Sequence, residues 1–105
     1  IIRYAHEKIL PMDEALGLVA IDFSGRPHCE FVAKFSREYV GDFPTEMLGH
    51  FYKSFSDMSG INLNIKLEGD NTHHLVEVSF KAFARCLKEV VRREGTAISS
   101  TKGVL

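Results

Sequence analysis

The sequence predicts an α+β domain, in which an antiparallel sheet is covered by helices on one face. Several stretches alternate apolar and polar side chains with a period of two, and two longer stretches repeat apolar side chains with a helical period. Strands of this kind form a sheet with one apolar face, which two amphipathic helices can bury. The 105 residues, 45% of them hydrophobic, are enough for one core, so we expect a single domain over residues 1–105.

The first part of the chain is expected to supply three strands. The stretch that ends near residue 10 is predicted to be a strand, followed by a short helical turn over residues 12–16. Residues 19–24 and 29–35 both alternate, and the Ser-Gly-Arg-Pro segment at 24–27 has the composition of a turn. This order predicts an antiparallel hairpin.

The next element is predicted to be an amphipathic helix. Asp42 and Pro44 suit the start of a helix, and Gly60 suits its end. The predicted apolar stripe consists of Met47, Leu48, Phe51, Phe55 and Met58.

A strand and a longer helix are predicted to follow. Residues 61–67 alternate as a strand, and Asn71 or Thr72 suits the cap of the last helix. The polar residues 99–103 are predicted to form a loop. The predicted core stripe of the last helix consists of Val76, Phe80, Phe83, Leu87 and Val90.

Composition argues against several classes of function. The net charge of −1, from 13 basic and 14 acidic residues, does not suit a nucleic-acid-binding surface. No apolar run approaches the roughly 20 residues that cross a bilayer, and the N-terminus lacks the pattern of a signal peptide. Cys29 and Cys86 lack CxxC spacing, so we expect free, partly buried thiols and a cytoplasmic location, although the sequence leaves a disulfide open. The start at Ile1 suggests a fragment, a processed chain or an incomplete one.

The strongest chemical signal is the cluster His73, His74 and Glu77 at the start of the last helix. Imidazole and carboxylate groups are both ligands of divalent metals. At about 100° per residue, His73 and Glu77 share one helix face, whereas His74 points toward a second position. The pattern therefore predicts a ridge between two metal sites. The competing interpretation is a solvated face, in which Glu77 and Lys81 form an ordinary i,i+4 pair.

Other polar residues support a site for a phosphorylated ligand. His50 lies on the polar face of the first helix, where a surface histidine is the plain alternative. Guanidinium, ammonium and hydroxyl groups on loops suit a phosphate monoester, although each is otherwise an ordinary surface group. The groups in question are Arg3, Arg26, Lys81, Ser100, Thr101 and Lys102.

Several short motifs resemble imidazoleglycerol-phosphate dehydratase, the lyase of histidine biosynthesis. They occur in the family's order and extend over nearly the whole chain. The motifs are Pro11-Met12-Asp13-Glu14-Ala15-Leu16, Asp22-Phe23-Ser24-Gly25-Arg26-Pro27, Asn71-Thr72-His73-His74 with Glu77, Phe80-Lys81-Ala82-Phe83-Ala84-Arg85 and Ser100-Thr101-Lys102-Gly103-Val104-Leu105. The resemblance covers only the C-terminal half of the family, whose members are built from two similar halves, each with its own His-His motif.

This resemblance implies a fold and partners. Each half of a family member has a left-handed βαβ arrangement similar to the second domain of ribosomal protein S5. The halves pack together, and many copies assemble into a large homo-oligomer with metal sites at subunit contacts. The implied location is cytoplasmic, or plastid in a plant.

The resemblance also implies a reaction and the residues that carry it. The reaction is the dehydration of D-erythro-imidazole-glycerol phosphate to imidazole-acetol phosphate with two Mn²⁺ ions per site. His73 and Glu77 would hold one ion, His50 and His74 the other, and the missing half would supply further ligands. Glu77 would also transfer a proton. The substrate would be bound by His73 and by Arg3, Arg26, Lys81, Ser100, Thr101 and Lys102.

Three alternatives remain open at the level of sequence. A half-length chain that supplies two ligands to each metal is expected to bind metal weakly and to be inactive alone. Two copies of the chain could instead replace the two halves of the family. The chain could also be a non-catalytic assembly or RNA-binding module of the same fold, although its near-neutral charge argues against RNA.

Overall fold

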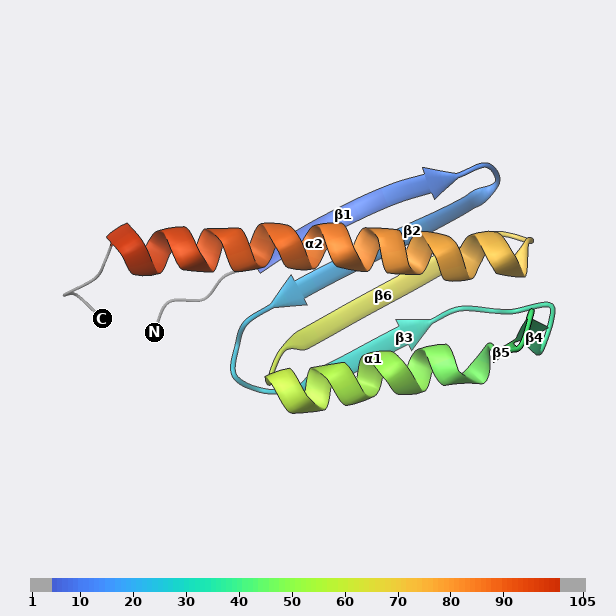
Figure 1. Cartoon of the computed structure of the whole chain (residues 1–105), viewed down its shortest axis with the longest axis horizontal. Helices are drawn as coiled ribbons and strands as arrows, with labels where there is room; N and C mark the ends of the chain where they lie inside the picture. Colours follow the sequence, from blue (N-terminus) through green and yellow to red (C-terminus); the bar gives the residue numbers. More distant parts are fainter. Residues whose placement is uncertain (1–4, 101–105) are drawn as a thin grey trace.

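The computed structural model describes the backbone of residues 5–100 and the side chains of residues 5–92 (Figure 1). Two helices and six strands make up this part of the chain. In chain order they are β1 (Ala5–Met12), β2 (Ala15–Asp22), β3 (His28–Val32), β4 (Tyr39–Val40), β5 (Phe43–Pro44), α1 (Glu46–Ser59), β6 (Asn62–Glu68) and α2 (Thr72–Ser100). Within the described residues, neither helix is long and apolar enough to cross a membrane.

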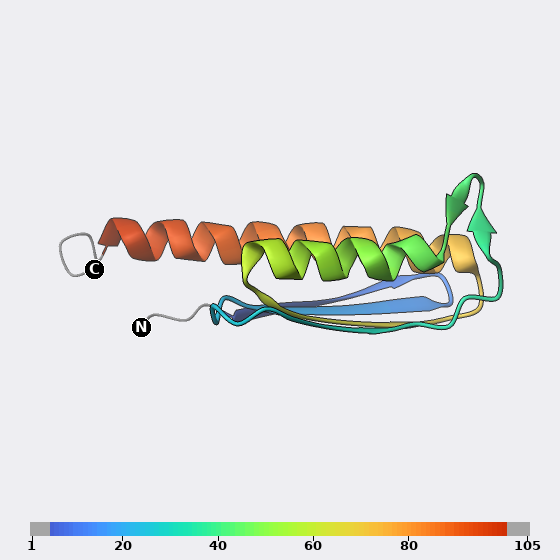
Figure 2. The same ribbon diagram turned by 90° about the horizontal axis from the view of Figure 1, so that it is seen from below.

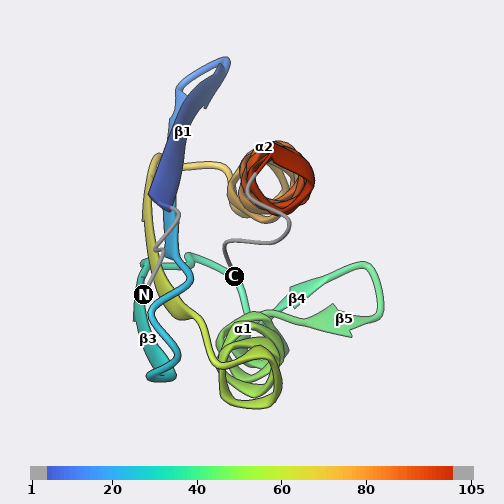
Figure 3. The same ribbon diagram turned by 90° about the vertical axis from the view of Figure 1, so that its left-hand side faces the viewer.

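The main sheet has four strands in the order β1-β2-β6-β3. β2 is antiparallel to both of its neighbours, β1 and β6, and β3 is parallel to β6. Both helices lie on the same face of this sheet (Figures 2 and 3). α2 packs over β1 and β2, and α1 packs mainly over β3. The predicted α+β class, a mainly antiparallel sheet with helices on one face, is therefore confirmed.

The β3–α1–β6 crossover is left-handed. β3 and β6 are neighbouring parallel strands, and α1 connects them on the helix side of the sheet. Viewed from the helix side with both strands pointing upward, β6 lies to the left of β3 (Figures 1 and 3). Because such connections are almost always right-handed, this hand is a specific property of the fold. It matches the half-unit that the resemblance implies.

The predicted antiparallel hairpin between residues 19–24 and 29–35 is wrong. Both stretches form strands, but β6 lies between β2 and β3. The connection over residues 23–27 therefore crosses about 10 Å, the spacing of two strand positions. β6 takes the central place because four side chains of its segment are fully or almost fully buried against the helices. These are Ile61, Leu63, Ile65 and Leu67.

A second error concerns the predicted helical turn over residues 12–16. β1 and β2 form a hairpin in which Met12 pairs with Ala15, so Asp13 and Glu14 alone make the turn. Asp13 has a φ of 51°, a left-handed conformation that aspartate tolerates better than most residues. The strand predicted to end near residue 10 is confirmed as β1.

The first helix begins later than predicted. Phe43 and Pro44 belong to β5, and Thr45 precedes the first helical residue. The predicted end is confirmed, because Gly60 has a φ of 71° and its N–H donates to the Ser56 carbonyl oxygen at 2.9 Å. The buried face is Leu48, Tyr52 and Ser56. Of the predicted stripe, Leu48 is buried and Phe55 half-buried, whereas Met47, Phe51 and Met58 are exposed.

The last helix begins as predicted but continues further. The Asn71 side chain accepts the His74 backbone N–H at 3.1 Å, which identifies Asn71 as the cap. The helix continues through Ser100, so the predicted loop is wrong at Ser99 and Ser100, and residues 101–103 lie outside the described part. The predicted stripe is shifted because α2 packs on both the sheet and α1. Among residues 72–92, the fully or nearly buried side chains are Thr72, Leu75, Val78, Ser79, Ala82, Phe83, Cys86 and Val90, while Phe80 is exposed and Val76 and Leu87 are half-buried.

Contacts between the helices fix how they lie along each other. The buried Tyr52 hydroxyl is 3.1 Å from Ser79 Oγ, and burial raises the pKa of Tyr52 to about 12. Phe55 and Phe83 meet edge to face with ring centroids 5.1 Å apart. The helices run in the same direction side by side, so their first turns lie at the same end of the domain (Figure 1). Cys29 and Cys86 are both free thiols, as expected.

Candidate metal-binding site

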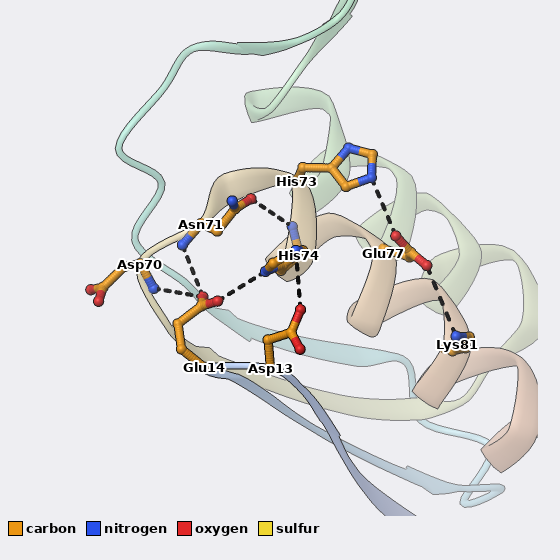
Figure 4. Close-up of polar contacts among 8 residues, drawn as sticks. All are labelled: Asp13, Glu14, Asp70, Asn71, His73, His74, Glu77 and Lys81. Atoms are coloured by element: carbon orange, nitrogen blue, oxygen red, sulfur yellow. Dashed lines mark hydrogen bonds and ion pairs between the residues drawn. The ribbon is translucent and has the colours of Figure 1, made fainter.

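The first turn of α2 points its two histidines toward different parts of the molecule (Figure 4). His73 lies on the outer face of the helix, on the side of Glu77 and Lys81. His74 faces the β1–β2 turn. This divergence follows from the helical rotation of about 100° per residue, and it is the geometry that the sequence predicted.

The His73 side of the turn is an exposed row of polar groups on one helix. His73 Nε2 lies 3.2 Å from Glu77 Oε1, and the other Glu77 oxygen lies 3.9 Å from the Lys81 ammonium. These side chains are between 45% and 66% exposed. Both contacts of this row come from the i,i+4 spacing of α2, so solvent screens them strongly.

The His74 side is held by a different part of the chain. Glu14 Oε1 lies 2.9 Å from His74 Nδ1, and Asp13 Oδ2 lies 3.6 Å from His74 Nε2. The His74 side chain is 26% exposed, less than half the exposure of His73. The β1–β2 turn thus brings two carboxylates to one imidazole.

Glu14 also binds the backbone that leads into α2. Its Oε2 accepts the backbone N–H groups of Asn71 at 3.0 Å and Asp70 at 3.1 Å (Figure 4). The Asn71 N–H and the His74 imidazole hold the pKa of Glu14 down to about 2. Conversely, the hydrogen bond to Glu14 raises the pKa of His74 above its ordinary value.

His50 lies on the exposed side of α1. The pairing of Tyr52 with Ser79 and of Phe55 with Phe83 places His50 level with Glu77 along the helix axes. Among the described side chains, none forms a hydrogen bond or ion pair with His50. The structure therefore places His50 at the same end of the helix layer as His73 and His74, without direct contact.

Of the predicted phosphate-binding residues, Arg26 and Lys81 have side chains in the described part of the chain. Arg26 lies in the loop after β2, and the eight residues of β2 at about 3.3 Å each put it about 25 Å from the Asp13–Glu14 turn. Arg3, Thr101 and Lys102 lie outside the described residues, and only the backbone of Ser100 is described. Lys81 lies beside the His73–Glu77 row, with its ammonium 3.9 Å from Glu77.

Sequence reasoning missed Glu14 and Asp13 as part of this site. Two acidic residues between two alternating stretches indicate a two-residue hairpin turn. The prediction of a helical turn over residues 12–16 excluded this interpretation. Nothing local in the sequence indicates that this turn lies against residues 70–74, because the contact spans about 60 positions along the chain.

The donor set fits a divalent metal only in part. Among the side chains of residues 5–92, no three His, Cys, Asp or Glu groups are arranged to hold one ion. The hydrogen bond between His74 Nδ1 and Glu14 leaves Nε2 as the nitrogen available to a ligand, and His73 with Glu77 supplies one imidazole and one carboxylate on one face. The chemistry suits Mn²⁺ or a similar ion, but further ligands are needed.

Comparison with known proteins gives the same family as the motifs. The sequence matches the imidazoleglycerol-phosphate dehydratase family over residues 1–87. It is 56% identical over 96 residues to the histidine biosynthesis bifunctional protein HisB of Stenotrophomonas maltophilia (strain K279a). The aligned region covers 91% of this chain and 27% of that protein. For the HisB protein of Spirosoma linguale the identity is 59% over 100 residues, covering 92% of this chain and 26% of the relative.

Solved structures agree with the sequence comparison. Imidazoleglycerol-phosphate dehydratase from Staphylococcus aureus matches with a TM-score of 0.77 at 41% identity, over 80% of this chain and 50% of the other. The Pyrococcus furiosus enzyme, solved with (S)-C348, matches with a TM-score of 0.73 at 30% identity, over 80% and 48%. This chain spans about a quarter of the curated relatives and about half of the solved chains. The chain belongs to the imidazoleglycerol-phosphate dehydratase family.

Proposed function

We propose that this chain forms part of a dehydratase that converts D-erythro-imidazole-glycerol phosphate to imidazole-acetol phosphate in histidine biosynthesis. The observation that carries the proposal is the divergence of His73 and His74 at one helix turn, in a chain that belongs to this family. Two adjacent imidazoles with different surroundings suit two metal positions on either side of the turn. We take the ions to be Mn²⁺.

The residues of the site have distinct roles in this proposal. His73 with Glu77 holds one ion, and His50 with His74 holds the other. A bound Mn²⁺ supplies Lewis acidity and orients the substrate. Glu77, whose two oxygens face His73 and Lys81, also accepts or returns a proton. Lys81 binds the phosphate, for which its position on the same helix face is suited.

The site is shared with another polypeptide segment. The chain spans about half of the solved relatives, and two protein ligands per ion rarely hold a metal tightly. Apolar side chains on the helices remain exposed, among them Met47 at 47%, Phe51 at 44% and Phe80 at 39%. Phe51 adjoins His50, and the rings of Phe51 and Phe80 lie 5.8 Å apart. A second half that covers these side chains would also reach the candidate ligands.

Some substrate-binding residues act from elsewhere in the assembly. Arg26, at the opposite end of β2 from His74, reaches a substrate at this turn only when another copy or half brings its loop there. Arg3, Ser100, Thr101 and Lys102 complete the proposed phosphate site. A large homo-oligomer with sites at subunit contacts satisfies this requirement.

The test combines this chain with the other half of a family member and assays dehydration under Mn²⁺. We expect activity only from the combination, and a decrease of at least about 100-fold for His73→Ala. The matched control is His28→Ala, which removes an exposed histidine on β3 whose side chain pairs with Glu30 at 2.9 Å. Full activity of the chain alone would contradict the shared site. No activity in any combination would contradict the proposed function.

A further inference from the structure

Three hydrogen-bond donors converge on the carboxylate of Glu14. The His74 imidazole approaches Oε1 at 2.9 Å, and the backbone N–H groups of Asp70 and Asn71 approach Oε2 at 3.1 and 3.0 Å. Backbone N–H groups can only donate, so Oε2 has to be an acceptor. A carboxylate satisfies both sides at once, because both of its oxygens accept.

The chain is built tightly around this contact. Gly69 has a φ of 154°, and a Cβ at this position would lie 2.8 Å from Ala15 Cα and 3.1 Å from Glu14 Oε2. Only glycine allows the backbone before α2 to pass this close to the β1–β2 turn. The turn and the start of α2 therefore form one unit, and Glu14 has little freedom to leave His74.

From this geometry we infer that Glu14 is a positioning residue that holds His74 with its proton on Nδ1 and so reserves Nε2 for a divalent metal. A neutral histidine carries one ring proton, and the hydrogen bond at one nitrogen decides which nitrogen is left as a ligand. Glu14 fixes both the ring orientation and the tautomer before metal arrives. The part of the inference that concerns metal binding rests on the proposed function. The tautomer of His74 does not, because it is a property of the metal-free protein.

Asp13 does not share this role. Its carboxylate is 78% exposed and lies 3.6 Å from Nε2, beyond hydrogen-bond distance. The neighbouring carboxylates of one turn therefore differ in function, and the second supplies a matched control for the first.

Glu14→Gln separates the positioning role from simple loss of charge. The new side chain has one acceptor oxygen, which the two backbone N–H groups of Asp70 and Asn71 attract, so its amide NH₂ faces His74. An NH₂ group donates, and His74 Nδ1 then has to accept, with its proton moved to Nε2. We therefore expect this variant to invert the tautomer, while Asp13→Asn leaves it unchanged.

The experiment has two readouts. The ¹⁵N shifts of the His74 ring are measured by NMR in the metal-free chain at a pH well above the His74 pKa. Mn²⁺ affinity is measured for the chain combined with its complementing half, where we expect Glu14→Gln to weaken binding on the order of 10- to 100-fold and Asp13→Asn to have little effect. Circular dichroism of each variant checks that α2 is intact.

The outcomes separate this inference from the proposed function. An inverted tautomer with weakened Mn²⁺ binding supports both. An unchanged tautomer in a folded Glu14→Gln variant overturns the positioning role, whatever the metal affinity. A third outcome is that Glu14→Gln inverts the tautomer but the unaltered protein takes up no Mn²⁺. That outcome overturns the proposed metal function and supports control of the His74 tautomer by Glu14.

Discussion

His73 and His74 are neighbours in sequence, yet they are held in opposite ways. His73 pairs with Glu77, a side chain of its own helix, and both groups are exposed. His74 is held by a carboxylate from the β1–β2 turn, which at the same time binds the backbone before α2. One histidine thus depends on helix periodicity, and the other depends on the tertiary fold.

This difference teaches that a local motif can describe a site while leaving its support hidden. The spacing of His73 and Glu77 alone places their side chains together, since any α-helix does so. The placement of His74 requires the hairpin turn, the close passage at Gly69 and the capped start of α2. Changes in the fold should therefore affect the two histidines unequally.

Gly69→Ala should have the largest effect, and it should act on His74 while leaving His73 unchanged. The added methyl group would meet Ala15 Cα at 2.8 Å in a backbone conformation that only glycine adopts readily, so the β1–β2 turn has to move away from α2. We expect a loss of about 1–3 kcal/mol in the free energy of unfolding, measured by urea denaturation. NMR should show that the His74 ring signals move while those of His73 stay.

Gly25→Ala is the control for Gly69→Ala. Gly25 also has a positive φ, 81°, but nothing lies within 4 Å of the added methyl group. This variant carries backbone strain without the clash and should leave both histidines unchanged. Equal loss of stability in the two variants, with no movement of His74, would contradict a tight contact between turn and helix.

Replacement of each histidine by alanine should show that His74 contributes more than His73 to the free energy of unfolding. His73→Ala should change the free energy of unfolding by less than about 0.5 kcal/mol, because an exposed i,i+4 pair contributes little. His74→Ala should destabilise the chain more, because it removes the partner of Glu14. Both variants should weaken Mn²⁺ binding in the completed protein. Equal stability of the two variants by denaturation would show that the Glu14 contact adds nothing to folding.

The Glu14–His74 pair should also give stability a dependence on pH. The pKa of Glu14 is lowered from 4.5 to about 2, so its contribution is complete above about pH 4.5 and is lost as the pH falls toward 2. The pKa of His74 is raised above 6.5, so its contribution is complete below about pH 6.5 and is lost as the pH rises through the folded-state value. In the metal-free chain the pair therefore stabilises most between these limits.

Denaturation at a series of pH values measures this window. Glu14→Gln removes the titrating carboxylate, so its stability should vary less between acidic and neutral pH than that of the unaltered chain. Asp13→Asn should retain the window, since Asp13 lies 3.6 Å from His74 and is mostly exposed. Identical profiles for the unaltered chain and Glu14→Gln would contradict this assignment.

The same contrast decides how much of the molecule could be predicted from sequence. Alternation and helical periodicity are local, so the strand and helix segments and the His73–Glu77 row followed from them. Strand pairing is not local: nothing in residues 19–35 indicates that β6 inserts between β2 and β3. The position of Arg26 far from His74 has the same origin, because it depends on strand order. To predict that Asp13 and Glu14 contact His74, one has to know that they form a hairpin turn and that this turn lies against the start of α2.

Lys81→Met should have the smallest effect on the fold and a selective effect on the site. The ammonium lies 3.9 Å from Glu77 and is 50% exposed, so its loss should change the free energy of unfolding by only a few tenths of a kcal/mol. If Lys81 binds the substrate phosphate, the completed enzyme should show a raised KM and an unchanged His74 tautomer. Lys53→Met is the matched control, since Lys53 forms a similar exposed i,i+4 pair with Asp57 on α1 at 3.3 Å. An equal rise in KM for both variants would assign the effect to general surface charge, whereas a rise for Lys81→Met alone would place the phosphate on the His73 side of the turn.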